Sequence, residues 1–202
     1  MFLKKKIFLP LVAFILLFIF FYKNHKSKPV DLIGGNFELT NHLGQKMTND
    51  SFNGHYRLVF FGFTNCPDFC PNTLNNIGEV IEQIDKKKKL VPIFITVDPE
   101  RDTVTKLEKY LRNFHPKIIG LTGSKDAIKN VKTKYKIFSK KVMDMKKEDK
   151  NSNNHHDNHD HGGYGIDHTT IIYLMDKKGK YISHFSPDTN ISIMVKKINK
   201  FL

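Results

Sequence analysis

The stretch that decides the fold spans residues 58–70 and reads Leu58-Val59-Phe60-Phe61-Gly62-Phe63-Thr64-Asn65-Cys66-Pro67-Asp68-Phe69-Cys70. Its first six residues are a continuous apolar run, as expected for a strand that is buried on both faces. Apolar residues then follow at helical spacing, at positions 74, 77, 81 and 84. The only two cysteines of the 202-residue chain therefore lie at a predicted strand-to-helix junction.

The two cysteines are four positions apart, so their sulfurs share a face if a helix begins within residues 67–72. A helix N-terminus also favours the thiolate, which both redox attack and metal binding require. The pair Cys66 and Cys70 then has three interpretations. It is a redox couple, part of a metal site, or a structural pair such as a disulfide clasp in an oxidising compartment.

Further elements on both sides of the junction complete an α/β pattern. Asp102 or Thr103 is expected to cap the helix that begins at residue 104. The predicted order is a hairpin (37–48), a strand (58–63), a helix (about 70–84), a strand (91–97), a helix (104–114), a strand (118–121), a helix (127–135), a hairpin (170–175 and 181–185) and a helix (191–202). A βαβ core followed by a hairpin and a helix predicts a thioredoxin-like fold.

A histidine near the last hairpin bears on the choice between redox couple and metal site. Oxidoreductases of the thioredoxin type use Cys-x-x-Cys and place a proline directly before the strand that faces the dithiol. Here three residues separate the cysteines, and His168 stands where that proline is expected. Two thiolates and one imidazole suit a soft ion such as Cu(I), whereas zinc normally takes a fourth ligand or a water. His168 faces the two sulfurs only in a thioredoxin-like fold.

The N-terminus is predicted to be a membrane anchor, residues 1–22. Lys4, Lys5 and Lys6 precede residues 7–22, which are uncharged and mostly apolar. This run is slightly shorter than the ~20 residues that a bilayer requires, but flanking lysines extend its reach. A cleaved signal peptide is the alternative, and the absence of small residues after the run argues against it. Residues 23–33 are then a linker, and residues 34–202 form a domain on the outer, periplasmic side of the cytoplasmic membrane.

Composition excludes one class of partner. The net charge is +13, but the lysines are scattered and the chain contains only three arginines, Arg57, Arg101 and Arg112. Because no basic reading helix or known motif is present, nucleic-acid binding is not expected.

Residues 146–165 are polar and low in complexity, and we predict a mobile loop there. The loop contains His155, His156, His159 and His161. A solvated tract of low affinity is preferred over a second metal site.

Three separated motifs resemble the Sco/SenC family of copper-binding assembly factors. They are residues 63–71 (FTNCPDFCP), residues 96–103 (TVDPERDT) and residues 167–169 (DHT). The resemblance extends from about residue 34 to residue 202. It implies a thioredoxin-like domain that binds one copper ion through Cys66, Cys70 and His168. It also implies a role in building the dinuclear copper centre of cytochrome c oxidase.

Two activities are compatible with that role. In the first, the protein is a copper chaperone that supplies the copper-receiving subunit of the oxidase. In the alternative, it is a membrane-anchored thiol-disulfide reductase, in which Cys66 and Cys70 cycle and His168 is dispensable. Whether the protein is an enzyme therefore stays open. For Asp98, a structural role at the end of a strand is preferred over a place beside the metal.

Overall fold

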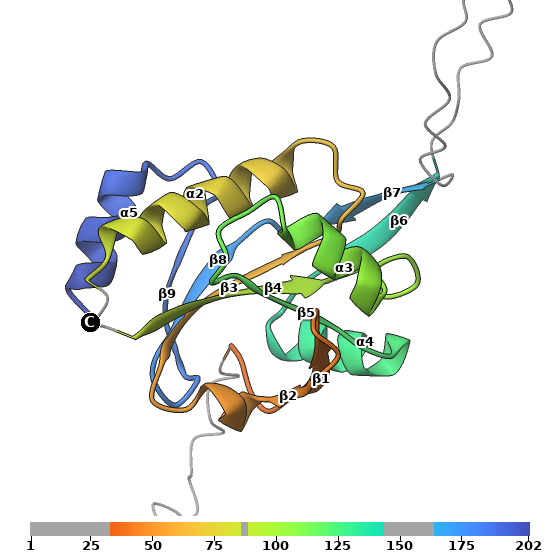
Figure 1. Cartoon of the computed structure of the whole chain (residues 1–202), viewed down its shortest axis with the longest axis horizontal. Coiled ribbons are helices and arrows are strands. Elements are labelled where there is room, and N and C mark those ends of the chain that lie inside the picture. The colour runs from red at the N-terminus through yellow and green to blue at the C-terminus, as the bar shows by residue number, and fades with distance from the viewer. Residues whose placement is uncertain (1–32, 86–88, 144–163) are drawn as a thin grey trace, which may run out of the picture. The chain divides into compact units, whose positions relative to one another are not determined.

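Seven strands form one mixed sheet in the computed structural model, which describes residues 33–85, 89–143 and 164–202 (Figure 1). Across the sheet they are ordered β2 (Lys46–Thr48), β1 (Glu38–Asn41), β5 (Ile119–Thr122), β4 (Leu90–Thr96), β3 (Tyr56–Gly62), β8 (Ile172–Met175) and β9 (Tyr181–Phe185). The central strands β3, β4 and β5 are parallel, and the other pairs are antiparallel. Strand β3 lies inside the sheet between β4 and β8, and residues 58–62 are buried because helices cover both faces of the sheet, as their apolar run predicted.

Helices cover both faces of this sheet. On one face, α2 (Phe69–Gln83) and α3 (Val104–Leu111) lie so close to the strands that a Cβ on Gly62 or Gly120 would meet their side chains. On the opposite face, Phe61 packs against Tyr135 at the end of α4 (Lys125–Lys134). The last helix, α5 (Ile191–Asn199), lies beside α2 (Figure 1). A short 3₁₀ helix, η1 (Asn49–Phe52), connects β2 to β3.

The helices form where apolar spacing and capping residues coincide. The predicted apolar face of α2 is buried, at Leu74, Ile77 and Ile81. The cap of α3 is Thr103, whose hydroxyl accepts a hydrogen bond from the Lys106 N–H at 3.3 Å. Asp102, the other candidate for this cap, is fully buried and bonded elsewhere.

A separate two-stranded ribbon was not predicted. It pairs β6 (Ser139–Met143) with β7 (Tyr164–His168). The prediction that residues 164 and 165 belong to a loop is wrong, because both are in β7. The last hairpin, expected from residue 170, begins at Ile172, and His168 ends β7 ahead of it. Neither ribbon strand shows apolar alternation, and the long polar tract between them hides their pairing.

Several N-terminal and internal predictions lie outside the described residues. These are the membrane anchor (1–22), all of the linker except Ile33, and the four clustered histidines. Among the helices that the structure describes, none combines the length and the apolar character needed to cross a bilayer.

Candidate metal centre

The two thiols lie at the junction between β3 and α2. Cys70 is in the first turn of α2 and is buried, whereas Cys66 is in the preceding loop and is half-buried. The backbone N–H of Cys70 donates to the Sγ atom of Cys66 at 3.4 Å. Both thiols are free. One donor of the helix N-terminus is therefore directed at the more accessible sulfur.

Gly62 allows Cys70 to lie directly against the sheet. A Cβ atom on Gly62 would be 2.7 Å from the Cys70 Sγ atom and 2.7 Å from the Phe94 ring. Any larger residue would displace the sulfur or the ring. The glycine is visible in the apolar run, but no local pattern indicates that it contacts a thiol.

His168 faces Cys70 from the end of β7. Its Nε2 atom lies 3.9 Å from the Cys70 Sγ atom, and the ring of Phe63 packs edge-on against the imidazole at 5.8 Å. The Nδ1 atom lies 2.9 Å from the carbonyl oxygen of Thr169, to which it donates a hydrogen bond. This bond places the proton on Nδ1 and leaves the Nε2 lone pair available toward the sulfur.

The structure thus brings Cys66 against Cys70 and Cys70 against His168, although the three side chains are not grouped as a formed metal cluster. Within residues 33–85, 89–143 and 164–202, no three or more His, Cys, Asp or Glu side chains are grouped closely enough to hold a metal ion. Contacts do connect the three in sequence. The Cys66 sulfur accepts a hydrogen bond from the Cys70 backbone N–H, and the Cys70 sulfur faces the His168 imidazole.

The environment separates the acidities of the two thiols. The pKa of Cys66 is lowered to about 5, first by a hydrogen bond from the Cys70 side chain and then by the Cys70 N–H. The pKa of Cys70 is raised, because it donates that bond and because burial disfavours its thiolate. At neutral pH the pair therefore holds one proton, with a thiolate at Cys66 and a thiol at Cys70.

A buried carboxylate holds the loop that carries Cys66. Asp102 accepts hydrogen bonds from the Thr64 N–H at 3.0 Å, from the Thr64 hydroxyl at 2.6 Å and from the Thr96 hydroxyl at 2.6 Å. The Lys106 ammonium also donates to the Asn65 side chain. Sequence reasoning missed this role, because an acid just before a helix looks like a cap.

The other acidic candidate, Asp98, has structural partners. It forms an ion pair with Arg101 and accepts a hydrogen bond from the Tyr164 hydroxyl at 2.9 Å. This agrees with the structural role that was preferred for it.

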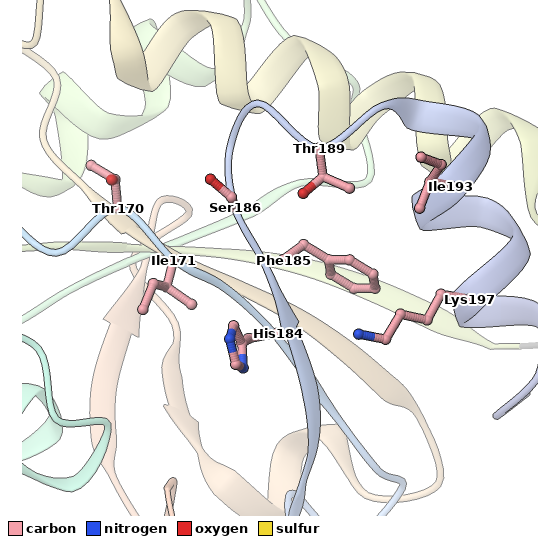
Figure 2. Close-up of a pocket in the computed structure, with 8 residues that line it drawn as sticks. All are labelled: Thr170, Ile171, His184, Phe185, Ser186, Thr189, Ile193 and Lys197. Atoms are coloured by element: carbon pink, nitrogen blue, oxygen red, sulfur yellow. The ribbon is translucent and has the colours of Figure 1, made fainter.

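A hollow between β9 and α5 is separate from the thiols (Figure 2). Its walls include Thr170, Phe185 and Lys197, and the three candidate ligands are not among its lining residues. His184 at its edge is hydrogen-bonded to the Tyr181 hydroxyl at 2.6 Å. The hollow is therefore not part of the candidate metal centre.

The fold and the site together define a class of protein: a thioredoxin-like domain whose dithiol, at the start of a helix, is faced by a histidine. The family model described as SCO1/SenC matches residues 25–202. The chain therefore belongs to the SCO1/SenC family, which confirms the resemblance seen in its motifs.

Individual relatives agree with this assignment. The SCO2-like protein of Rickettsia prowazekii is 45% identical over 157 residues, which are 77% of this chain and 70% of that protein. The solved structure of Bradyrhizobium japonicum ScoI with copper bound is 37% identical, with a TM-score of 0.70 over 84% of this chain and 99% of that one. BsSco, described as a member of the Sco family of cytochrome c oxidase assembly proteins, is 21% identical with a TM-score of 0.60, over 86% of this chain and 95% of that one, and supports the fold alone.

Proposed function

We propose that this protein is a copper chaperone that binds one copper ion through Cys66, Cys70 and His168. The observation that carries the proposal is the 3.9 Å approach of the His168 Nε2 atom to the Cys70 Sγ atom. Metal–sulfur bonds of ~2.3 Å and metal–nitrogen bonds of ~2.0 Å place two such ligands of one ion roughly 3.6 Å apart. Two sulfurs and one imidazole are also the soft donor set that Cu(I) prefers.

The chain's own residues prepare this site before any ion arrives. Cys66 already carries the thiolate that a metal needs, whereas Cys70 must release its proton on binding. The carbonyl of Thr169 keeps the Nε2 lone pair of His168 free. The Phe63 ring contacts the imidazole edge-on and supports its orientation.

The recipient in this proposal is the copper-receiving subunit of cytochrome c oxidase, in which the ion joins a dinuclear centre. The motif resemblance to copper-binding assembly factors and the membership of the SCO1/SenC family support this choice. We also propose that residues 7–22 anchor the chain in the cytoplasmic membrane, with the domain on the periplasmic side. The intact mass of the membrane-extracted protein tests the anchor, because cleavage would remove roughly the first 20 residues.

Copper content of the reduced, purified protein tests the site. We expect about one copper per chain in the wild type, and loss of tight binding when Cys66, Cys70 or His168 is replaced singly by alanine. His184→Ala is the matched control, since His184 is paired with Tyr181 away from the thiols. Stoichiometric copper retained by His168→Ala would contradict the three-ligand site.

A thiol-disulfide reductase is the second candidate, and the unequal thiols favour it. A low-pKa, half-exposed Cys66 beside a protonated Cys70 is a nucleophile with a resolving partner. In that activity the Cys66 thiolate attacks a substrate disulfide, and Cys70 then displaces the substrate thiol and closes the disulfide between the two. Turnover by His168→Ala with a disulfide substrate and a dithiol reductant would support it, and absence of exchange in the wild type would exclude it.

A further inference from the structure

The ribbon of β6 and β7 carries His168 but is separate from the seven-stranded sheet that positions the thiols. Figure 1 shows the ribbon beyond the end of that sheet, near the start of α3. A metal site divided between these two parts needs a contact that sets their relative position. The loop before α3 provides one through Arg101.

Arg101 contacts the first residue of β7. Its Nη1 atom donates a hydrogen bond to the carbonyl oxygen of Tyr164 at 2.9 Å, and its guanidinium carbon lies 3.7 Å from the centre of the Tyr164 ring. Asp98 contacts both residues: it forms an ion pair with the Arg101 Nε atom and accepts a hydrogen bond from the Tyr164 hydroxyl at 2.9 Å. The Asp98 side chain is only 1% exposed and that of Arg101 14%, so these contacts are shielded from solvent.

Arg101 also extends toward the metal centre. Its guanidinium carbon lies 5.8 Å from the centre of the Phe63 ring, which packs edge-on against His168. The contacts thus connect the first residue of β7, through Arg101 and Phe63, to the last residue of β7. Phe63 is also the first residue of the loop between β3 and Cys66. The same side chain therefore lies next to the loop of the thiols and to His168.

Another directional contact holds the start of β6, where the Ser139 hydroxyl accepts a hydrogen bond from the Lys132 ammonium of α4 at 2.5 Å, but it does not touch β7, which carries His168. The remaining contacts are less specific. The ion pair of Lys141 with Glu100 is exposed, and such pairs contribute little. The hydrogen bonds between Phe138 and Thr169 join the two arms of the ribbon to each other and not to the sheet. Ile166 packs partly against the core, without the directional constraint of a planar stack.

We propose that Arg101 is a positioning residue of the metal centre: by stacking on Tyr164 and contacting the Phe63 ring, it sets the place of the His168 imidazole relative to the two thiols. This inference rests on the proposed copper function. Arg101 acts through His168 and does not itself touch the ion.

Arg101→Lys tests the proposal, because lysine keeps the charge near Asp98 but loses the planar stack and the forked donors. We expect affinity for Cu(I) to fall roughly 10-fold, the lower end for partners that orient a ligand. In a His168→Ala background the same change should alter affinity by less than about twofold, since the residue through which Arg101 acts is gone. An equal loss in both backgrounds would overturn the proposal.

Two further variants keep this test decisive. Arg112→Lys is the matched control, because Arg112 is exposed at the C-terminal end of α3 and forms an ion pair with Glu108. The Cu(I) affinity of this variant should equal that of the wild type. If Arg101→Lys does not fold, Tyr164→Leu removes the stack from the ribbon side and should show the same dependence on His168. Tyr164→Phe keeps the ring and should lose much less affinity than Tyr164→Leu.

A metal-free measurement separates this inference from the proposed function. In the apo protein, the imidazole NMR signals of His168 should be displaced by the neighbouring Phe63 ring. Arg101→Lys should move these signals toward the positions of an unstructured histidine while the thermal unfolding curve stays unchanged. Unmoved His168 signals would overturn the positioning role even if copper binds. Failure of the wild type to bind copper would refute the chaperone function, and the NMR result would still decide the position of the ring.

Discussion

The Nε2 atom of His168 lies 3.9 Å from the Sγ atom of Cys70, although the two residues are 98 positions apart in the chain. This contact joins the end of the β6–β7 ribbon to the first turn of α2. The candidate centre is therefore complete only when the ribbon is docked. A change that loosens the ribbon is expected to weaken metal binding without changing any ligand.

Cys66 is expected to react with iodoacetamide in mildly acidic solution. Its pKa is lowered to about 5, so the alkylation rate should rise with pH through that value. Cys70 is buried and its pKa is raised, so it should stay unmodified while the protein is folded. Timed labelling between about pH 4 and pH 9, followed by peptide mass spectrometry, measures both thiols.

Cys70→Ala is the control for that experiment. It removes the side-chain hydrogen bond that does most to lower the pKa of Cys66, so the midpoint should move up toward the ordinary value of 9.0. A wild-type midpoint already near 9.0 would contradict the unequal acidities.

Bound Cu(I) should protect Cys66 from alkylation. A coordinated thiolate is no longer a free nucleophile, so loading should slow the reaction by roughly 10-fold or more at neutral pH, and a Cu(I) chelator should restore it. Protection should be weaker in His168→Ala, because one ligand is missing. An alkylation rate that is the same with and without Cu(I) would show that Cys66 is not a ligand.

Gly62→Ala should destabilise the domain by about 1–3 kcal/mol, because its Cβ would lie 2.7 Å from both the Cys70 Sγ atom and the Phe94 ring. Urea unfolding followed by circular dichroism measures the loss. Gly165→Ala is the matched control, since the nearest atom to its Cβ is 3.9 Å away. Equal stability of the two variants would mean that the approach of Cys70 to β3 is looser than described.

The stability of the Asp102→Asn variant, compared with that of the wild type, should increase as pH rises. Desolvation raises the pKa of the buried Asp102 carboxyl above its ordinary value of 3.8, although the hydrogen bonds from Thr64 and Thr96 oppose this. A carboxyl whose pKa is higher in the folded state than in the unfolded state stabilises the fold at pH values below the unfolded-state pKa. This stabilisation is lost as pH rises through the folded-state pKa. The asparagine side chain does not titrate and has no such loss.

Urea unfolding of both proteins at about pH 3 and about pH 7 measures this difference. The free energy of unfolding of Asp102→Asn minus that of the wild type should be larger at the higher pH. A difference that falls between the two conditions would show that the hydrogen bonds outweigh desolvation and that the pKa of Asp102 is lowered.

Most of the fold was predictable because its signals are local. The apolar run before Gly62 predicted a strand buried on both faces, and the spacing of Leu74, Ile77 and Ile81 predicted the face of α2. Both signals follow from the repeat of a single element. The leading hairpin and, apart from η1, β6 and β7, the order of strands and helices were predicted in the same way.

The site was predictable only in part. The positions of Cys66 before α2 and of Cys70 in its first turn agree with the predicted strand-to-helix junction, whereas His168 was expected just before the last hairpin and is the last residue of β7. The roles of Asp102 and Arg101 were missed, because both lie in a segment that a strand end and a helix cap already explain.

The sequence by itself determined that two cysteines lie one helical turn apart at the end of a buried strand, because periodicity and spacing act within a few residues. Only the tertiary structure decided that Cys70 is the buried thiol and Cys66 the thiolate, and that a ribbon closed across a long polar tract brings His168 to them. Pairing between distant strands and the burial of one sulfur against Gly62 depend on packing of the whole domain. No local sequence pattern indicates that packing.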